Sequence, residues 1–280
     1  MRRPPARLLS CALLCVVGMA TEAAAARCFA TIASGSGASF FQVCISDRGN
    51  VVSFETPAGY EQAISGDGYV LCSADRAGVP TVHGWDAGGF GEEGFAPPLV
   101  EQPNGPNTLP LRITRVTLDG TFELVQTFRF DGLEKDLTVN MRVTNLTNEP
   151  RLRVALARFL RMSPNQSVET GSQHGENNAT RTADSVLLWD DSADDGPQGP
   201  AYGVGLTART FQTRHRTVVE DHDDWNPADS DGPQRAEGCS PIGLTTPKLG
   251  LRDLQGRVTY DFGTIGRFGA RRVAFLYRHY

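Results

Sequence analysis

Residues 122–150 read FELVQTFRFDGLEKDLTVNMRVTNLTNEP and carry the most regular pattern in this chain. Apolar side chains alternate with polar ones from Phe122 to Phe130, and the same alternation returns from Leu137 to Val143. A period of two is typical of β-strands that bury one face, and the Asp131-Gly132 pair between the two runs is a turn former. The stretch therefore predicts antiparallel strands, each with one face in a core.

The pattern extends on both sides of this stretch. The turn former Asp119-Gly120 precedes it, and Leu152, Val154 and Leu156 alternate with other residues after it. We predict that residues 110–160 form an antiparallel meander of four strands. Shorter strands are expected at residues 40–45, 51–54, 68–72, 258–262 and 272–280. Because these runs are short and Gly and Pro interrupt the chain, no helix is predicted.

The fold class that follows is all-β, with one large antiparallel β-sandwich over residues 27–280. Loop-rich insertions are predicted near residues 84–108 and 190–240. Residues 1–26 read as a signal peptide, with basic residues before an apolar run from Leu8 to Met19 that is too short to span a bilayer. The mature chain is expected to begin at Arg27, without a membrane span, and to be secreted or periplasmic.

Charge and cysteines support this interpretation. The chain has a formal net charge of −5, which argues against nucleic acid as a partner. Outside the signal peptide stand Cys28, Cys44, Cys72 and Cys239. An even number in an exported chain predicts two disulfides, and their spacing contains no C-x-x-C pair for zinc. We expect the pairs Cys28–Cys44, in neighbouring predicted strands, and Cys72–Cys239.

The sequence contains no recognised catalytic motif. G-x-S-x-G, H-E-x-x-H and glycine-rich phosphate loops are absent, and the histidines are scattered. Residues 220–231 are strongly acidic, and clustered carboxylates on a loop suit Ca²⁺. The candidate calcium ligands are Asp221, Asp223, Asp224, Asp229 and Asp231. The alternative is a solvated acidic loop, since the bidentate Glu of an EF-hand is missing.

The tryptophans lie next to acids or amides. An aromatic face stacks on a sugar ring while a neighbouring carboxylate or amide bonds the hydroxyls, so this context favours glycan binding. The candidate ligand-binding residues are Trp85, Asp86, Trp189, Asp190 and Trp225. The alternative is that the tryptophans fill the core and that the aspartates begin turns.

Residues 122–150 also resemble the central strands of galactose mutarotase-like sandwiches. The resemblance implies a supersandwich fold. In that family the next strand carries a catalytic histidine in an H-P-Y-F-like motif, whereas here the strand ends Ala157-Arg158-Phe159-Leu160-Arg161. The fold is therefore implied without the epimerase chemistry. Through stretches such as residues 44–51, CISDRGNV, the chain further resembles exported bacterial β-sandwich proteins of unassigned function.

Three functions remain open at this point, because a fold does not determine a function. The first is a glycan- or surface-binding module without catalysis. The second is a polysaccharide-active enzyme, a hydrolase, lyase or epimerase, which uses carboxylates on the sandwich face. The third is a structural or interaction protein of the envelope. The oligomeric state is also open.

Overall fold

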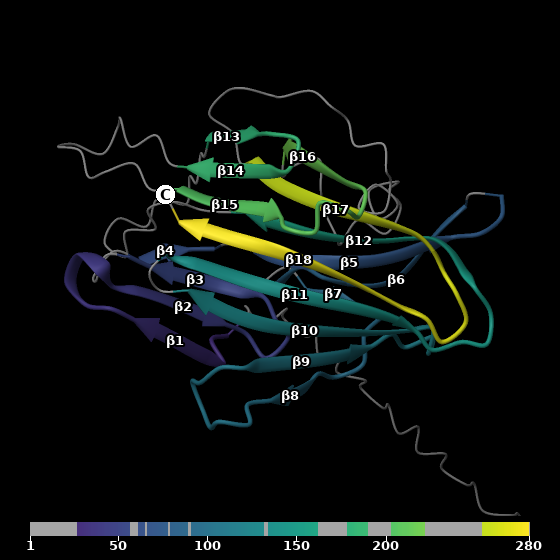
Figure 1. Ribbon diagram of the computed structural model, residues 1–280, viewed down its shortest axis with the longest axis horizontal. Coiled ribbons are helices and arrows are strands. Elements are labelled where there is room, and N and C mark those ends of the chain that lie inside the picture. Colours follow the sequence, from purple (N-terminus) through teal and green to yellow (C-terminus); the bar gives the residue numbers. More distant parts are fainter. Residues whose placement is uncertain are drawn as a thin grey trace, which may run out of the picture.

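The computed structural model describes residues 27–56, 61–64, 66–77, 79–88, 91–131, 134–161, 178–189, 203–221 and 254–279. Their strands form three antiparallel sheets (Figure 1). Within these ranges there is no α-helix, and the helical residues belong to 3-10 turns at Gly37–Ser39 and at Gly88, so the all-β prediction is confirmed. None of these residues belongs to a helix long and apolar enough to span a membrane. The predicted signal peptide lies outside the described residues.

The sheets have these strands in spatial order. The four-stranded sheet contains β1 Ala30–Ser34, β2 Phe41–Ile45, β3 Val51–Glu55 and β4 Glu61–Ala63. The eight-stranded sheet contains β13 Asn178–Arg181, β14 Ser185–Trp189, β15 Gly203–Ala208, β18 Ala270–His279, β11 Asp136–Asn145, β10 Phe122–Asp131, β9 Leu111–Val116 and β8 Leu99–Glu101. The six-stranded sheet contains β16 His215–Asp221, β17 Leu254–Ile265, β12 Arg151–Arg161, β5 Gly66–Ala74, β6 Pro80–Asp86 and β7 Glu92–Glu93.

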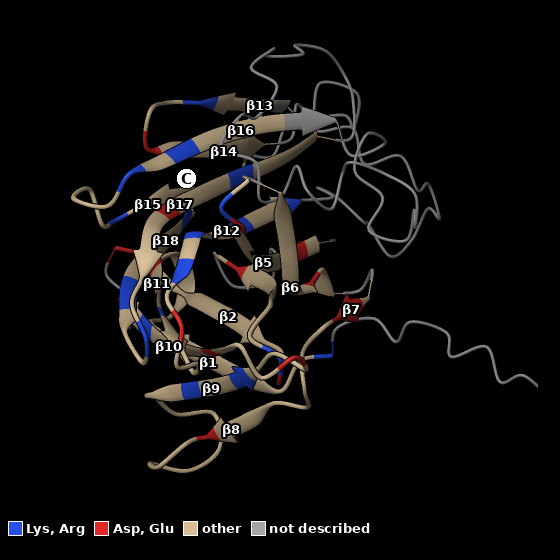
Figure 2. Ribbon diagram, turned by 90° about the vertical axis from the view of Figure 1, so that its right-hand side faces the viewer, with Lys and Arg blue, Asp and Glu red and all other residues tan. Residues whose placement is uncertain are grey.

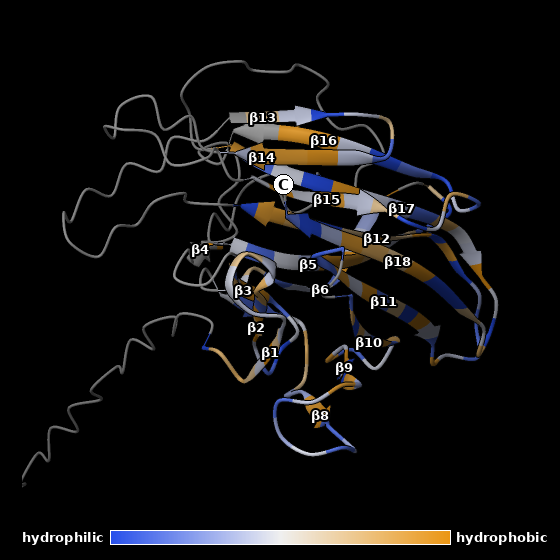
Figure 3. Cartoon of the chain, turned by 60° about the vertical axis from the view of Figure 1, so that its left-hand side comes forward, coloured by the Kyte–Doolittle hydropathy of each residue, from blue (hydrophilic) through white to orange (hydrophobic). Residues whose placement is uncertain are grey.

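The hydrophobic core lies between the inner faces of the sheets. On β11 the predicted alternation holds, because Leu137, Val139, Met141 and Val143 are buried while the residues that alternate with them are partly exposed. Figure 3 shows this alternation as orange and blue bands along β11 and β18. The ring of Phe41 on β2 stacks on Phe130 of β10 with centroids 4.9 Å apart, which joins the four-stranded sheet to the same core.

The predicted meander is correct for three strands and wrong for the fourth. Strands β9, β10 and β11 pair in succession, but β12 pairs with β5 and β17 in the six-stranded sheet. The reason is burial on both faces. Every residue from Val154 to Leu160 is buried, and a central strand covered on both sides needs such a nearly continuous apolar run. The chain therefore crosses from one layer to the other after Asn145.

Other predictions have mixed outcomes. The hairpin of β2 and β3 is present, and β18 lies inside its sheet between β15 and β11. Two strands, β15 and β16, occupy part of the stretch that was predicted to be loop-rich. Cys28 and Cys44 are joined by a disulfide, with Cα atoms 5.5 Å apart. Cys72 is disulfide-bonded as well, but Cys239 lies outside the described residues, so that pairing stays a prediction.

Candidate functional site

A pocket of about 630 Å³ lies on the face of the eight-stranded sheet that points away from the core. We call it the outer pocket. It is lined by Arg112, Val125, Thr127, Arg129, Asn140, Met141, Arg142, Thr210, Arg272, Val273 and Ala274. These residues come from the neighbouring strands β9, β10, β11 and β18, and from the segment after β15. Figure 2 shows blue, basic residues recurring on β9, β11 and β18.

The floor of the outer pocket follows from strand register. Thr127 on β10 stands opposite Arg112 on β9 and Asn140 on β11, and Asn140 stands opposite Ala274 on β18. One row of side chains thus crosses four adjacent strands. Because successive residues of a strand point to opposite faces, the row projects outward while Phe128 and its inward-facing neighbours fill the core. The floor is made of the three smaller side chains of this row, Thr127, Asn140 and Ala274, which offer a hydroxyl and an amide.

The rim of the outer pocket is basic. Arg142 forms an ion pair with Glu123 at 2.9 Å, and Arg112 pairs with Glu101 at 3.4 Å. Arg129 and Arg272 are exposed and make no ion pair with any residue that the structure describes. Among the lining residues there is no carboxylate, histidine or cysteine. The arrangement can therefore hold hydroxyl groups and negative charge, and it lacks a general acid or base.

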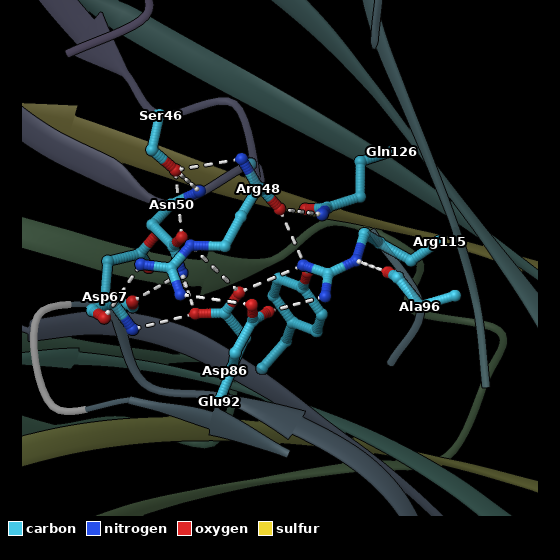
Figure 4. A network of polar contacts seen from close by, with 12 residues as sticks. Ser46, Arg48, Asn50, Asp67, Asp86, Glu92, Ala96, Arg115 and Gln126 are labelled. Atoms are coloured by element: carbon cyan, nitrogen blue, oxygen red, sulfur yellow. Dashed lines mark hydrogen bonds and ion pairs between the residues drawn. The ribbon is translucent and has the colours of Figure 1, made fainter. Parts of the chain in front are cut away.

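The predicted ligand residue Asp86 lies elsewhere, in a buried network of charges (Figure 4). Its carboxylate is 3.2 Å from Arg115 Nη1, and it accepts a hydrogen bond from Asn50 Nδ2 at 3.1 Å. The same arginine reaches Glu92 at 2.5 Å, and Arg48 lies between the two acids at 3.7 and 3.5 Å. The Asp86 carboxylate is fully buried, so the network holds the 46–50 turn against the two larger sheets.

Burial raises the pKa of the Asp86 carboxyl to about 6, although the charge of Arg48, the Gly88 N–H and the charge of Arg115 act in the opposite direction. A carboxyl with this pKa is mostly ionised at neutral pH. Its donors hold it in place inside the protein rather than presenting it to solvent. Asp86 is thus positioned as a structural group.

Trp85 points to the opposite face of the same strand. It packs against a small cluster that includes Val70 and Ala157 on the outer face of the six-stranded sheet. Its indole N–H donates to Glu93 Oε2 at 3.3 Å. The acid beside the Trp85 ring is therefore Glu93 and not its sequence neighbour Asp86.

The remaining predicted site residues are spread over the chain. Trp189 ends β14 and is partly buried. Asp221 ends β16, and nothing further is described of its side chain. Asp190, Asp223, Asp224, Trp225, Asp229 and Asp231 lie outside the described residues. Among the residues that the structure does describe, no group of His, Cys, Asp and Glu side chains is arranged to hold a metal ion.

A Ser–His–Asp chain of hydrogen bonds lies at one end of the sandwich. The Ser73 hydroxyl and His83 Nε2 are 2.8 Å apart, and His83 Nδ1 is 2.6 Å from Asp119 Oδ2. A β-bulge in the pairing of β5 with β6 turns the His83 ring edge-on to Phe122. This is the order of groups in a catalytic triad, but Ser73 and His83 are each only 7% exposed. Sequence motifs did not reveal it because the three residues are far apart in the chain.

The outer pocket was also missed at the level of sequence. Its signal was present, since Arg112, Arg129 and Arg142 all fall on the polar side of alternating strands. Nothing in the sequence indicates that β18, from the far end of the chain, pairs with β11 and adds Arg272 to the same face.

No protein-family model and no curated protein matches this chain. Solved structures share its fold. A bacterial glucoamylase complexed with acarbose has a TM-score of 0.57 at 8% identity and matches 91% of this chain. The chain spans about a third of that protein, 32% of its length.

The matches also include a putative aldose 1-epimerase from Escherichia coli K12, with a TM-score of 0.47, 12% identity and coverage of 89% of this chain and 98% of that one. A galactose mutarotase related enzyme from Lactobacillus acidophilus has a TM-score of 0.39, 10% identity and coverage of 89% and 97%. Mutarotase-related proteins are thus among the structural matches. At 8% identity the likeness to the glucoamylase concerns the fold alone.

Proposed function

We propose that this chain is an exported glycan-binding module that has no catalytic activity of its own. The observation that carries the proposal is the outer pocket, a hollow of about 630 Å³ on the surface of the eight-stranded sheet that is lined by polar, basic and apolar residues. Its floor places the Thr127 hydroxyl beside the Asn140 amide, and its rim adds guanidinium groups. Hydroxyl, amide and guanidinium groups are the partners that sugar hydroxyls and ring substituents require.

The lining of the outer pocket favours binding over catalysis. Hydrolysis of a glycosidic bond generally needs two carboxyl groups about 5 to 9.5 Å apart. The lining residues include no acid, and Glu101 and Glu123 next to the pocket each pair with an arginine of its rim. Among the residues that the structure describes, no pair of carboxylates therefore lines this pocket.

The structural likeness supports the same proposal. The crystal structure of the glucoamylase that shares this fold is a complex with acarbose, and this chain matches 32% of that protein. The predicted signal peptide adds export, which brings the module to extracellular or periplasmic glycans.

A glycan array tests the proposal directly. We expect the chain from residue 27 onward to bind a defined group of glycans, and the double variant Thr127→Val/Asn140→Leu to lose this binding. Both changes remove polar atoms from the floor at nearly constant side-chain volume. The matched control is Thr264→Val, which changes an exposed strand threonine on the six-stranded sheet. Binding that survives the double variant, or an array without a bound glycan, would contradict the proposal.

A second candidate function, a hydrolase, is favoured by the Ser73–His83–Asp119 chain. The Asp119 carboxylate orients the His83 imidazole. The imidazole can accept the proton of the Ser73 hydroxyl when the hydroxyl oxygen attacks the carbonyl carbon of an ester or amide. Hydrolysis is the second candidate because Ser73 and His83 are buried, which limits the access of a substrate. A fluorophosphonate probe that labels the wild-type chain, and not Ser73→Ala, would establish it in place of the non-catalytic module. Absence of labelling would remove it.

A further inference from the structure

We propose that the glycan held in the outer pocket is an acidic polysaccharide, whose sugar carboxylates pair with Arg129 and Arg272. This inference rests on the proposed function, because it names the chemical class of the ligand for the same pocket. It starts from the balance of charges on the rim, where four arginines meet only two acids.

The pairing of β11 with β18 places Arg142 directly opposite Arg272. Like charges at directly opposite positions on one face of a sheet destabilise it, because their Cβ atoms are only about 5 Å apart. Glu123 neutralises Arg142 at 2.9 Å, and no described carboxylate does the same for Arg272. An anion from a ligand would relieve the repulsion that the fold leaves in place.

Arg129 repeats the situation at the other end of the outer pocket. The nearby Arg112 forms an ion pair with Glu101, whereas Arg129 is exposed and has no described acid within ion-pair distance. An arginine presents a planar fork of N–H donors that matches the two oxygens of a carboxylate. The guanidinium groups of Arg129 and Arg272 are therefore suited to bind carboxylates rather than single hydroxyl groups.

The separation of these arginines indicates a polymer. Arg272 stands in register with Val125 across β11, and Arg129 follows Val125 by four residues along β10. With strands about 4.8 Å apart and a rise of about 3.4 Å per residue, the two backbone positions are on the order of 15 Å apart. One sugar ring does not cover such a span, whereas a short run of linked sugars does.

The net charge of the chain narrows the chemical class of the ligand further. The formal net charge of −5 disfavours a polyanion of high charge density, which would extend beyond the arginines of the rim. A nucleic acid carries one charge per about 1.7 Å of duplex and would meet this repulsion along its length. A polyuronate carries one carboxylate per sugar, and its polar, uncharged hydroxyls can face Thr127 and Asn140 on the floor.

The test compares polygalacturonate with its methyl ester, which keeps the sugar backbone and loses the charge. We expect wild-type protein to bind polygalacturonate at least tenfold more tightly than the ester, with affinity that falls as salt is added. The double variant Arg129→Gln/Arg272→Gln should lose about tenfold or more of the affinity for the acid form, and little for the ester. The matched control is Arg216→Gln, which changes an exposed arginine on β16 of the six-stranded sheet.

The outcomes separate this inference from the proposed function. Suppose that polygalacturonate and its methyl ester bind equally well and that Thr127→Val/Asn140→Leu loses both. This result would overturn the inference of an acidic ligand and would leave the proposed glycan binding intact. Absence of binding to both probes, with binding of neutral glycans on the array, would overturn it as well. Single-stranded DNA bound more tightly than polygalacturonate would replace the polysaccharide with a nucleic acid. The arginine variants must not melt at a lower temperature than the wild type, and loss of the repulsion between Arg142 and Arg272 allows a small increase.

Discussion

Arg158 Nη2 lies 2.5 Å from Asp67 Oδ2, and both side chains are fully buried between the sheets. The pair joins the adjacent strands β12 and β5. The Asp67 carboxylate also accepts hydrogen bonds from the Val51 N–H at 2.6 Å and from the hydroxyl of Tyr277. One buried carboxylate thus contacts all three sheets, since Val51 begins β3 and Tyr277 belongs to β18.

Removing one partner of this pair should strongly destabilise the fold. In Asp67→Asn the Arg158 guanidinium stays buried without a counter-charge, and breaking such a pair costs about 3–5 kcal/mol. Urea unfolding of the wild type and the variant measures the loss. Arg216→Gln, at an exposed position, should change the free energy of unfolding by less than about 0.5 kcal/mol. A similarly small change in Asp67→Asn would show that the pair does not hold the sheets together.

The Asp119 carboxylate should stabilise the fold in a pH-dependent way. Burial raises its pKa, but hydrogen bonds from Thr117, His83 and Thr121 outweigh burial and lower the pKa to about 2. Because this pKa is below the unfolded value of 3.8, the stabilisation is present above pH 4 and is lost as the pH falls toward 2. Because the Asp119 side chain is partly exposed to solvent, this stabilisation is limited to about 1 kcal/mol.

The measurement is the difference in unfolding free energy between the wild type and Asp119→Asn, at several pH values from 6 to 2. We expect this difference to shrink as Asp119 becomes protonated in the wild type. A difference that stays constant over the whole range would contradict the assigned hydrogen bonds.

His279 should remain neutral well below its ordinary pKa. Burial of the ring lowers its pKa to about 4, and the nearby charge of Lys135 acts in the same direction. The unfolded chain binds a proton near pH 6.5, so this group makes the fold less stable as the pH falls from 6.5 to 4. An NMR titration of the histidine ring protons, assigned with His279→Gln, measures the pKa. A value near 6.5 would mean that the ring is solvated.

The disulfides give a prediction that does not involve the outer pocket. Peptide mapping under non-reducing conditions should find Cys28 joined to Cys44 and Cys72 joined to Cys239. The first bond closes a loop with a sequence separation of 16, which on the chain-entropy model stabilises the fold by about 3 kcal/mol. The double variant Cys28→Ser/Cys44→Ser should therefore unfold at lower urea concentration. Free thiols at Cys72 and Cys239 would contradict the second pair.

Local pattern was enough to predict much of the fold. The alternation in residues 122–150 identified β10 and β11, and it also identified which of their side chains enter the core. It did not predict the layer to which β12 belongs, because strand partners are chosen by contacts between distant segments. Strand β12 pairs with β5 and β17, which lie far from it in the chain on either side.

The site was less predictable than the fold for the same reason. Trp85 and Asp86 are neighbours in the sequence, yet a strand sends them to opposite faces, one onto an outer cluster and the other into a buried network. Conversely, Arg129 and Arg272 line one pocket although they are far apart in the chain. Adjacency in the sequence therefore suggested a tryptophan–carboxylate site, whereas the register of β10, β11 and β18 assembled the outer pocket.

The most direct test of the central claim is to locate the bound glycan by NMR. The ¹⁵N-labelled chain is titrated with a glycan that it binds, and the shifted amide signals are mapped onto the strands. We predict that the shifts cluster on β9, β10, β11 and β18 around Thr127, Asn140 and Ala274, and that they disappear in Thr127→Val/Asn140→Leu. Shifts that cluster instead around Trp85 and Glu93, on the outer face of the six-stranded sheet, would contradict it.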